Sequence, residues 1–320
     1  MASGSPDRTI WIDGEWVAWD AAQVHILSHS HQRGSLVFDY MSVQETPAGT
    51  AVFRLQDHVQ RFLDSCRLIG LPQDFDAVTI GRAVCDTVVA NPGAKAVKVC
   101  AYLPAVEVDV VPLDTHVALA ISAYDPIRDV IGGKPNSPRT GPELSIRVES
   151  VIRNRRADLI PAQAKVAANY VAPMMAKWRA QREGFDEVVL LDESGHLAEG
   201  PTTNFFLVDP DGVVCTPSLD HVLPGITRAS VIELAKHDGF QVREGTLLPE
   251  DLDAAAEVFL TGTSAGVWPV VCVDGGNVGD GTVGPITLAL KNHFRQVVRG
   301  EDPAFSHWLF PVAAGRGGAS

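Results

Sequence analysis

One lysine, Lys165, lies alone in a segment of small and apolar residues, IPAQAKVAANY (Ile160–Tyr170). A buried ammonium without a counter-charge is costly, so a lysine in such a segment is expected to be neutral or covalently engaged. A neutral lysine amine is the usual nucleophile of Schiff-base chemistry. The simpler interpretation is a lysine at a helix start whose ammonium reaches water along its own stem. The segment therefore offers a candidate nucleophile, which other residues must support.

A carboxylate, Glu199, lies in HLAEGPTTNFFL (His196–Leu207), between an expected strand end and a Gly-Pro turn. Residues at such turns commonly have only a structural role. The functional alternative is a carboxylate that holds the protonated nitrogen of a cofactor ring, so that the ring can accept electrons. This segment alone leaves both interpretations open.

Three further features suit an anion. The segment LPGITR (Leu223–Arg228) leads into an expected helix, whose first backbone N–H groups have no partner within the helix. The segment LTGTSAG (Leu260–Gly266) offers small residues and hydroxyls, so backbone amides can approach a phosphate. The guanidinium of Arg61, in an expected helix, also matches phosphate oxygens. A plain helix cap, a plain turn and an exposed arginine are the alternatives.

The charge of the chain makes local capture of an anion necessary. The net charge is −13, so the overall field repels anions and argues against a nucleic-acid or anionic-membrane partner. The hydrophobic fraction of 46% and charged fraction of 20% are those of an ordinary globular protein. No apolar run approaches the roughly 18 residues of a transmembrane helix.

The cysteines and the N-terminus indicate a cytoplasmic protein. The cysteines form no CxxC pair, which argues against a disulfide framework or a zinc site, and we expect no metal; they are Cys66, Cys85, Cys100, Cys215 and Cys272. The first residues show no basic stretch followed by an apolar one, so we identify no signal peptide.

A length of 320 residues predicts two domains. Residues 1–124 predict a small α/β domain, with a hairpin at Asp13-Gly14 and further strands and helices at 36–43, 50–54, 57–70, 76–90, 96–103 and 117–123. Residues 125–142 are rich in Pro, Gly, Asn, Ser and Arg, which predicts an interdomain loop. Residues 143–320 predict a larger domain, with elements at 144–150, 169–184, 187–192, 204–208, 213–215, 227–238, 240–243, 257–261 and 285–299.

Taken together, these segments resemble the class IV aminotransferases, the pyridoxal-phosphate enzymes of fold type IV. The resemblance runs in order from about Thr9 to Arg299, and its motifs are VFRLQDHVQRFLDS, AKVAANY, GHLAEGPTTNFFLV, LPGITR and EVFLTGTSAGVWPV. It implies an α/β fold with a small N-terminal domain, a larger pseudo-barrel C-terminal domain and pyridoxal 5′-phosphate between them. It also implies a homodimer or a higher homo-oligomer, in which each subunit completes its neighbour's pocket.

The resemblance assigns roles to individual residues. Lys165 corresponds to the lysine that binds the cofactor and moves the proton. Glu199 corresponds to the partner of the pyridine nitrogen, and Tyr170 to the phenol beside the 3-oxygen. Leu223 would pack on the ring face and Asn204 would support the ring edge. The phosphate ligands correspond to Arg61, Ile226, Thr227 and Thr263.

The substrate is harder to infer. The start of the chain is similar to branched-chain aminotransferases, but FDYMS (Phe38–Ser42) lacks their glycine and arginine. Where that group has Tyr-x-Arg, we place Val97-Lys98-Val99, so we expect no arginine on the fixed wall. The pocket motifs are closer to (R)-selective amine transaminases, in which a loop arginine binds the keto acid. Here the candidate is Arg128, with Arg33 as a second possibility.

We therefore expect a transaminase that moves an amino group from a primary amine or amino acid to a 2-oxo acid. The first expectation is an (R)-selective amine transaminase, and the alternative is a branched-chain amino-acid aminotransferase. A lyase with the same cofactor and a cofactor carrier without turnover are weaker alternatives. The expected substrate-binding residues are Phe38, Tyr40, Val97, Val99, Arg128, Thr263 and Ser264.

Overall fold

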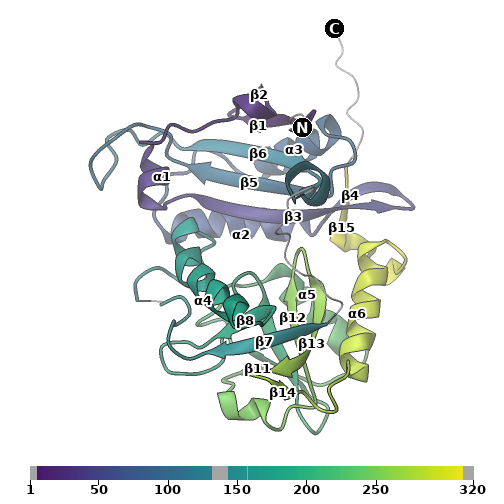
Figure 1. Ribbon diagram of the computed structural model, residues 1–320. Coiled ribbons are helices and arrows are strands. Elements are labelled where there is room, and N and C mark those ends of the chain that lie inside the picture. The colour runs from purple at the N-terminus through teal and green to yellow at the C-terminus, as the bar shows by residue number, and fades with distance from the viewer. Residues whose placement is uncertain (1–5, 132–142, 157, 313–320) are drawn as a thin grey trace, which may run out of the picture. The chain divides into compact units, whose positions relative to one another are not determined.

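The computed structural model describes residues 6–131, 143–156 and 158–312, which form two compact units (Figure 1). The first unit contains the described residues up to 131, Lys165–Ala168 and residues 297–312. The second contains the remaining described residues from 143 to 296. The expected boundaries placed everything after residue 143 in one domain, so the return of Lys165–Ala168 to the first unit was not foreseen. Residues 132–142 of the expected loop lie outside the described residues.

The first unit is built on a seven-stranded sheet of order β15-β4-β3-β5-β6-β1-β2, and each neighbouring pair of strands is antiparallel. The predicted hairpin is confirmed, because Asp13 and Gly14 connect β1 to β2 with positive φ angles of 48° and 97°. The strands are β1 (Thr9–Ile12), β2 (Glu15–Ala18), β3 (Val37–Thr46), β4 (Gly49–Phe53), β5 (Ala96–Tyr102), β6 (Ala118–Tyr124) and β15 (Leu309–Pro311).

Two helices, α2 (Leu55–Leu68) and α3 (Ala77–Ala90), pack on this sheet, α2 on β3 and α3 on β1, β5 and β6. The predicted helix start at residue 76 is confirmed, and the structure adds that the Asp76 side chain caps α3 by accepting a hydrogen bond from the Thr79 amide. The shorter helices are η1 (Trp19–Ala21), α1 (His29–Arg33), η2 (Pro126–Ile131) and η5 (Pro303–Trp308).

The second unit is built on an eight-stranded mixed sheet of order β11-β10-β9-β12-β13-β7-β8, with β14 beside β13. Isolated bridges join Leu191 to Leu197 and Glu199 to Asn204, which connects the β8 end of the sheet back to β9. The strands therefore curl toward closure around one apolar core. They are β7 (Leu144–Glu149), β8 (Glu187–Leu190), β9 (Asn204–Val208), β10 (Val214–Pro217), β11 (Val242–Gly245), β12 (Glu257–Gly262), β13 (Gly266–Val273) and β14 (Gly276–Asn277).

The helices of the second unit complete the α/β architecture that the sequence predicted. They are α4 (Val171–Arg182), α5 (Ile226–His237), η4 (Pro249–Leu252) and α6 (Pro285–Val298), whose last two residues belong to the first unit. The turn η3 (Ala167–Tyr170) leads into α4. Within the described residues, no helix has both the length and the apolar character needed to cross a membrane.

Candidate active site

The expected site residues fall into two sets, one on each unit, and Lys165 belongs to the first. Its backbone amide donates a hydrogen bond of 3.0 Å to the Ser65 Oγ on α2. Its carbonyl accepts a hydrogen bond of 3.0 Å from the Phe38 amide. The following residue, Val166, forms an antiparallel bridge with Val37. Lys165 is thus held as a short extra strand beside β3, and its side chain is only half-buried.

The two faces of the sheet differ in what they contact. Asp39 on β3 bonds to residues of α2, so its face is the one that the helices cover. Side chains of adjacent residues in a strand point to opposite faces, and directly paired residues share a face. Phe38 pairs with Cys100, and Tyr40 pairs with Lys98. These four residues therefore share the other face, which we call the Phe38 face.

Val97 and Val99 do not lie on the Phe38 face, so the expectation that they line the substrate wall is wrong. Val99 pairs with Asp39 and Val97 with Met41, and both valines are completely buried on the helix-covered side. The sequence placement had the wrong parity. A strand shifted by one residue exchanges every side chain between the two faces.

The observed pairing of Tyr40 with Lys98 places a cation, the Lys98 ammonium, on the Phe38 face. The Lys98 ammonium lies 4.6 Å from the centroid of the Phe38 ring, and the Lys165 ammonium lies 4.9 Å from the same centroid. No carboxylate of the described residues forms an ion pair with Lys98. The aromatic face stabilises the Lys98 ammonium. The ring carries no negative charge of its own, so the Lys98 ammonium can still bind an anion such as a carboxylate.

On the helix-covered face, Arg61 is held by Asp39. Its Nε donates to Oδ2 and its Nη2 to Oδ1, each at 2.8 Å, and the His58 Nδ1 lies 2.7 Å from Oδ1. Burial opposes the ionisation of Asp39, but Arg61 and then His58 outweigh it and hold the pKa of this carboxyl well below its usual range. Arg61 is therefore fixed in place before it meets any phosphate.

His58 is kept neutral in the same cluster. Burial is the main cause that lowers the pKa of this imidazole, with Arg61 and Lys165 adding to the effect and Asp39 opposing it. A neutral imidazole has one N–H, which here is on Nδ1 and donates to Asp39. The expected nucleophile lies close to this buried cluster, because the Lys165 amide donates to the Ser65 Oγ and that hydroxyl donates to the Arg61 carbonyl.

On the second unit, Glu199 is buried and surrounded by donors. Its Oε2 accepts from the Asn204 side-chain amide and from the Leu223 backbone amide, each at 3.2 Å. Its Oε1 lies 3.4 Å from the Asn154 amide and 3.5 Å from an Arg155 nitrogen. Such a donor set stabilises the ionised carboxylate. The structure thus brings together three of the residues predicted for the cofactor, namely Glu199, Asn204 and Leu223.

Arg155 connects this carboxylate to Tyr170. The guanidinium carbon lies 5.0 Å from the centroid of the Tyr170 ring, and Nη1 donates to the Ala162 carbonyl at 3.1 Å. Neither Arg155 nor Asn154 was predicted from the sequence. They lie in the run RNRR, which is unusually basic for so acidic a chain, and that was the available signal.

The predicted anion cradles both lie where the backbone can approach a ligand. Ile226 and Thr227 open α5, whose N-cap is Gly225. A Cβ at Gly225 would lie 1.9 Å from the Asn204 Oδ1, so only glycine lets the helix start so close to the Glu199 cluster. Arg228 points elsewhere, because it bonds to the Pro217 carbonyl and to Glu244.

Thr263 and Ser264 form the turn between β12 and β13, next to the turn that follows Glu199. A Cβ at Gly262 would lie 3.0 Å from the Thr202 carbonyl. Two buried hydroxyls here, of Thr203 and Thr261, have no hydrogen-bond partner among the described residues. Buried polar groups are normally bonded, so these atoms fit a polar ligand such as a phosphorylated cofactor. The Glu199 carboxylate, which these donors keep ionised, fits as the acceptor for the N–H of a protonated pyridoxal-phosphate ring.

Arg128 lies in η2, beyond the end of β6, and its side chain is exposed. Its Nε donates to Asp129 at 2.8 Å, and Asp129 is also bonded to Arg8. The ion pair with Asp129 raises the pKa of Arg128, so this guanidinium stays charged. Its predicted role in binding a keto acid remains a prediction.

The chain is similar to known aminotransferases over nearly its whole length. The family described as "Amino-transferase class IV" matches residues 36–273. The branched-chain-amino-acid aminotransferase of Salmonella typhimurium (strain LT2) is 34% identical over 308 residues, which are 95% of this chain and 97% of that protein. The enzyme of the same name from Escherichia coli (strain K12) is 33% identical over the same shares of the two chains.

Solved structures agree with the sequence comparison. The branched-chain aminotransferase of Thermoproteus uzoniensis with norvaline is 32% identical and has a TM-score of 0.86, covering 96% of this chain and 99% of that one. The branched-chain amino acid aminotransferase of Thermobaculum terrenum, in its PLP-form, is 28% identical, with a TM-score of 0.85 over 96% of this chain and 99% of that one.

Proposed function

This chain belongs to the class IV aminotransferases, which are pyridoxal-phosphate enzymes, and from that premise we propose that it transfers the amino group of an aliphatic amino acid to a 2-oxo acid. The single observation that carries the choice of substrate is Lys98, a cation without a carboxylate partner among the described residues, beside Lys165 on the Phe38 face. An amino acid supplies a carboxylate to such a cation, and a simple amine does not.

The residues divide the work of the reaction. The bound cofactor supplies a ring that accepts the electrons released at the substrate carbon. The Lys165 amine would take the proton from the substrate carbon and deliver it to the cofactor, and its half-buried side chain leaves room for this movement. Glu199 stabilises a protonated ring nitrogen through its ionised carboxylate. Lys98 binds the substrate carboxylate and orients the amino acid, while Arg61, Thr227 and Thr263 bind the phosphate.

The relatives support an aliphatic side chain on the substrate. Those described above are named branched-chain aminotransferases, at 28–34% identity over nearly the whole chain. The Phe38 face offers an aromatic ring and the Tyr40 side chain, both half-buried, which suits apolar contact. The expectation of carboxylate-free amines depended on Val97 and Val99 together with Ser42, and the two valine side chains face the helices instead.

An (R)-selective amine transaminase is the second candidate. It is favoured by Phe38–Ser42, which lacks the glycine and arginine of the branched-chain group. Comparing kcat/KM of the purified holoenzyme for L-leucine with 2-oxoglutarate and for (R)-1-phenylethylamine with pyruvate separates the two. We expect leucine to be the better donor by at least about tenfold, because the aromatic amine lacks the carboxylate and so loses one charge-assisted contact. A preference for the aromatic amine would instead establish the second candidate.

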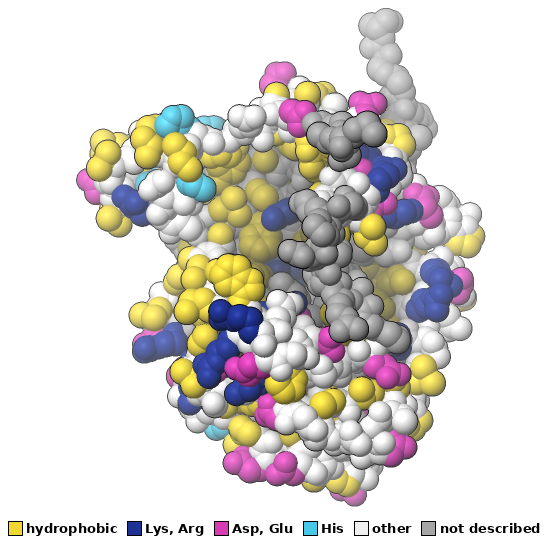
Figure 2. Space-filling model, in the orientation of Figure 1, with side chains coloured by type: hydrophobic (Ala, Val, Ile, Leu, Met, Phe, Trp, Pro, Cys, Tyr) yellow, Lys and Arg dark blue, Asp and Glu magenta, His cyan; other side chains and the backbone are white. Residues whose placement is uncertain are grey.

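We also propose that the chain forms a homodimer through the loop of residues 103–113. Arg33 donates to the Val108 carbonyl at 2.8 Å, and the His29 ring bonds to the Val110 carbonyl at 2.9 Å, so the loop is held in one conformation. Figure 2 shows hydrophobic side chains gathered on this projecting loop, at the upper left of the view, and the most exposed of them are Val108 and Leu113 at 92% and 89%. An ordered loop that exposes aliphatic residues is typical of an interface.

A further inference from the structure

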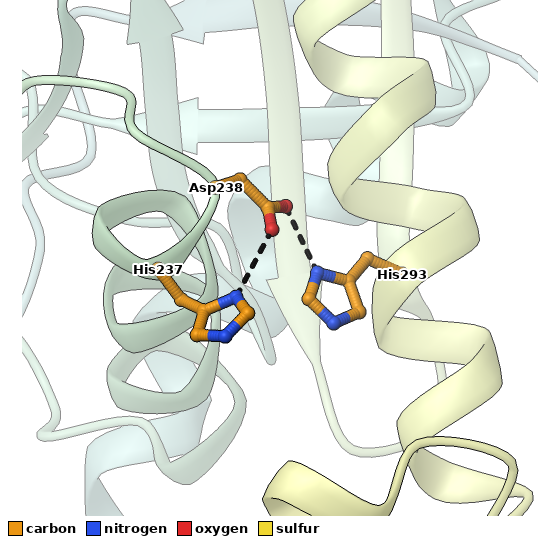
Figure 3. A group of neighbouring side chains, drawn as sticks. All are labelled: His237, Asp238 and His293. Carbon is orange, nitrogen blue, oxygen red and sulfur yellow. Dashed lines mark hydrogen bonds and ion pairs between the residues drawn. The ribbon is translucent and has the colours of Figure 1, made fainter.

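Three potential metal ligands, His237, Asp238 and His293, lie together on the second unit, outside the residues assigned to catalysis (Figure 3). Their ligand atoms all lie within 4.8 Å of one another. Both imidazoles direct Nδ1 at the same carboxylate, His293 at 2.9 Å from Oδ2 and His237 at 3.4 Å from Oδ1. The two rings come from different helices, with centroids 5.7 Å apart. The side chains thus converge on one point from two directions.

The backbone holds the first two ligands rigidly. His237 is the last residue of α5 and Asp238 is its C-cap. The next residue, Gly239, has a positive φ of 85°, its amide donates to the Lys236 carbonyl, and the Phe240 amide donates to the Ala235 carbonyl. This pair of bonds is the Schellman motif, which closes a helix in one defined geometry. The backbone positions of two adjacent ligands are therefore set before any ion binds.

The third ligand is also on a rigid element. His293 lies in α6, between Leu290, which is completely buried, and Phe294, which is nearly so. Its side chain is only 14% exposed, so few rotamers are open to it. Binding an ion would therefore cost little ordering of this side chain, since the fold has already restricted it.

The ligand chemistry selects a class of ion. Two imidazole nitrogens and one carboxylate oxygen suit zinc and similar divalent transition ions, and they do not suit Mg²⁺ or Ca²⁺, which prefer oxygen ligands. Bonds of about 2.0–2.2 Å in tetrahedral geometry require ligand atoms roughly 3.3–3.5 Å apart. The His293 Nδ1 lies 2.9 Å from Oδ2 and the His237 Nδ1 lies 3.4 Å from Oδ1, both close to that requirement. All ligand atoms lie within 4.8 Å of one another, so the exposed side chains of His237 and Asp238 need only a small adjustment to share one ion with His293. The C-terminal end of α5 adds a favourable field for a cation.

We propose that His237, Asp238 and His293 form a Zn²⁺ site, with water as the fourth ligand, that ties the end of α5 to α6. The ion replaces the hydrogen bonds between each Nδ1 and Asp238, and each neutral imidazole binds it through Nδ1 while its one proton is on Nε2. The site stabilises the fold and takes no part in amino transfer. The expectation of no metal rested on the cysteine pattern alone, and no local spacing marks this group, because His293 lies 55 residues beyond Asp238.

The test is calorimetric titration of the metal-stripped holoenzyme with ZnCl₂ at pH 7.5, with melting temperatures recorded with and without one equivalent of the ion. We expect one ion per chain, a rise in melting temperature with Zn²⁺ and none with Mg²⁺. His293→Ala and His237→Ala should each weaken binding by at least about tenfold and abolish the rise, since each removes one of three protein ligands. His237 is exposed, so its replacement leaves the fold intact and keeps the test valid if His293→Ala fails to fold.

The matched control is His196→Ala. The His196 Nδ1 lies 3.2 Å from the Asp192 carboxylate, which is the same kind of pair without a second imidazole. This variant should bind Zn²⁺ as the wild type does. Zn²⁺ affinity that is unchanged in both His237→Ala and His293→Ala would overturn the proposal, and so would the absence of any stoichiometric binding.

Discussion

Lys98 and Lys165 place their ammonium groups over the same aromatic ring, that of Phe38, at 4.6 and 4.9 Å from its centroid. The arrangement follows from two backbone pairings, that of Tyr40 with Lys98 in the sheet and that of Val37 with Val166 beside it. The Lys98 charge attracts the carboxylate of an amino-acid substrate that approaches this ring, and the rest of the substrate then lies next to the Lys165 amine. This placement is why we assign Lys98 to substrate binding.

Replacing Lys165 by Ala should abolish amino transfer, because it removes the amine that bonds the cofactor and carries the proton. The purified variant should also lose the visible absorbance of lysine-bound cofactor. The control is Lys95→Ala, an exposed lysine just before β5, which should keep both. Turnover and absorbance that both survive in Lys165→Ala would remove Lys165 from the mechanism.

Replacing Glu199 by Gln should slow the chemical step while the cofactor stays bound. A neutral amide cannot balance a pyridinium charge, and a charge-assisted hydrogen bond contributes about 1.5–3 kcal/mol. Single-turnover rates should then fall by at least about tenfold, since each 1.4 kcal/mol is a factor of ten. Glu193→Gln, at an exposed carboxylate, is the control and should leave the rate unchanged. An unaltered rate in Glu199→Gln contradicts the assigned role.

The buried cluster of Asp39, His58 and Arg61 should make the protein less stable in acid. The pKa of His58 is lower in the folded than in the unfolded chain, so unfolding takes up a proton, and stability falls as pH drops below about 6.5. The pKa of Asp39 is also lowered, so its contribution is present above about pH 4 and is lost below it.

His58→Gln keeps a donor for Asp39 but cannot take up the proton. The free energy of unfolding, measured in denaturant at pH 7.5 and 5.5, should therefore fall less for this variant than for the wild type. The difference can reach about 1.4 kcal/mol per pH unit for one proton. Equal losses in the two proteins would show that His58 does not titrate as the structure indicates.

The loop that carries Val108 should lie in the dimer interface. Val108→Asp would bury a carboxylate among aliphatic residues, which is costly, so the variant should be monomeric in light scattering after gel filtration. Val78→Asp is the matched control, because Val78 is 69% exposed on α3, far from this loop in the sequence, and should leave the dimer intact. A Val108→Asp protein with the wild-type mass would exclude this loop from the interface.

The sequence predicted the elements well where local signals were strong. Asp76 at the start of α3 and the Asn91-Pro92-Gly93 run at its end bracket that helix within a residue. The strand β13 was missed, because Pro269 lies in its middle and proline is unfavourable inside a sheet. Here Pro269 pairs with Phe259 of β12. The returning segment at Lys165 was missed because its partners in β3 are far away in the chain.

The motif residues were easier to find than their orientations. Glu199, Asn204 and Leu223 were each named from motifs, and the structure brings them into one hydrogen-bonded cluster. Val97 and Val99 were placed by matching Val97-Lys98-Val99 to the Tyr-x-Arg of branched-chain enzymes. Alternation along β5 could not correct this, because apolar residues occur on both of its faces. Asp39 was not connected with Arg61, since no local pattern marks a pair of residues that meet only when α2 packs on β3.

The most direct test of the account compares L-leucine with 3-methylbutan-1-amine, which is the same molecule without its carboxylate. The measurement is the second-order rate constant of the half-reaction with each donor, monitored by the loss of cofactor absorbance. It is made on wild type, Lys98→Met and the exposed control Lys95→Met. We predict that leucine reacts at least about tenfold faster in the wild type and in Lys95→Met. In Lys98→Met this preference should collapse, through slower reaction of leucine and unchanged reaction of the amine. A wild-type enzyme that does not distinguish the two donors, or a preference that persists in Lys98→Met, would contradict the claim that Lys98 binds the substrate carboxylate.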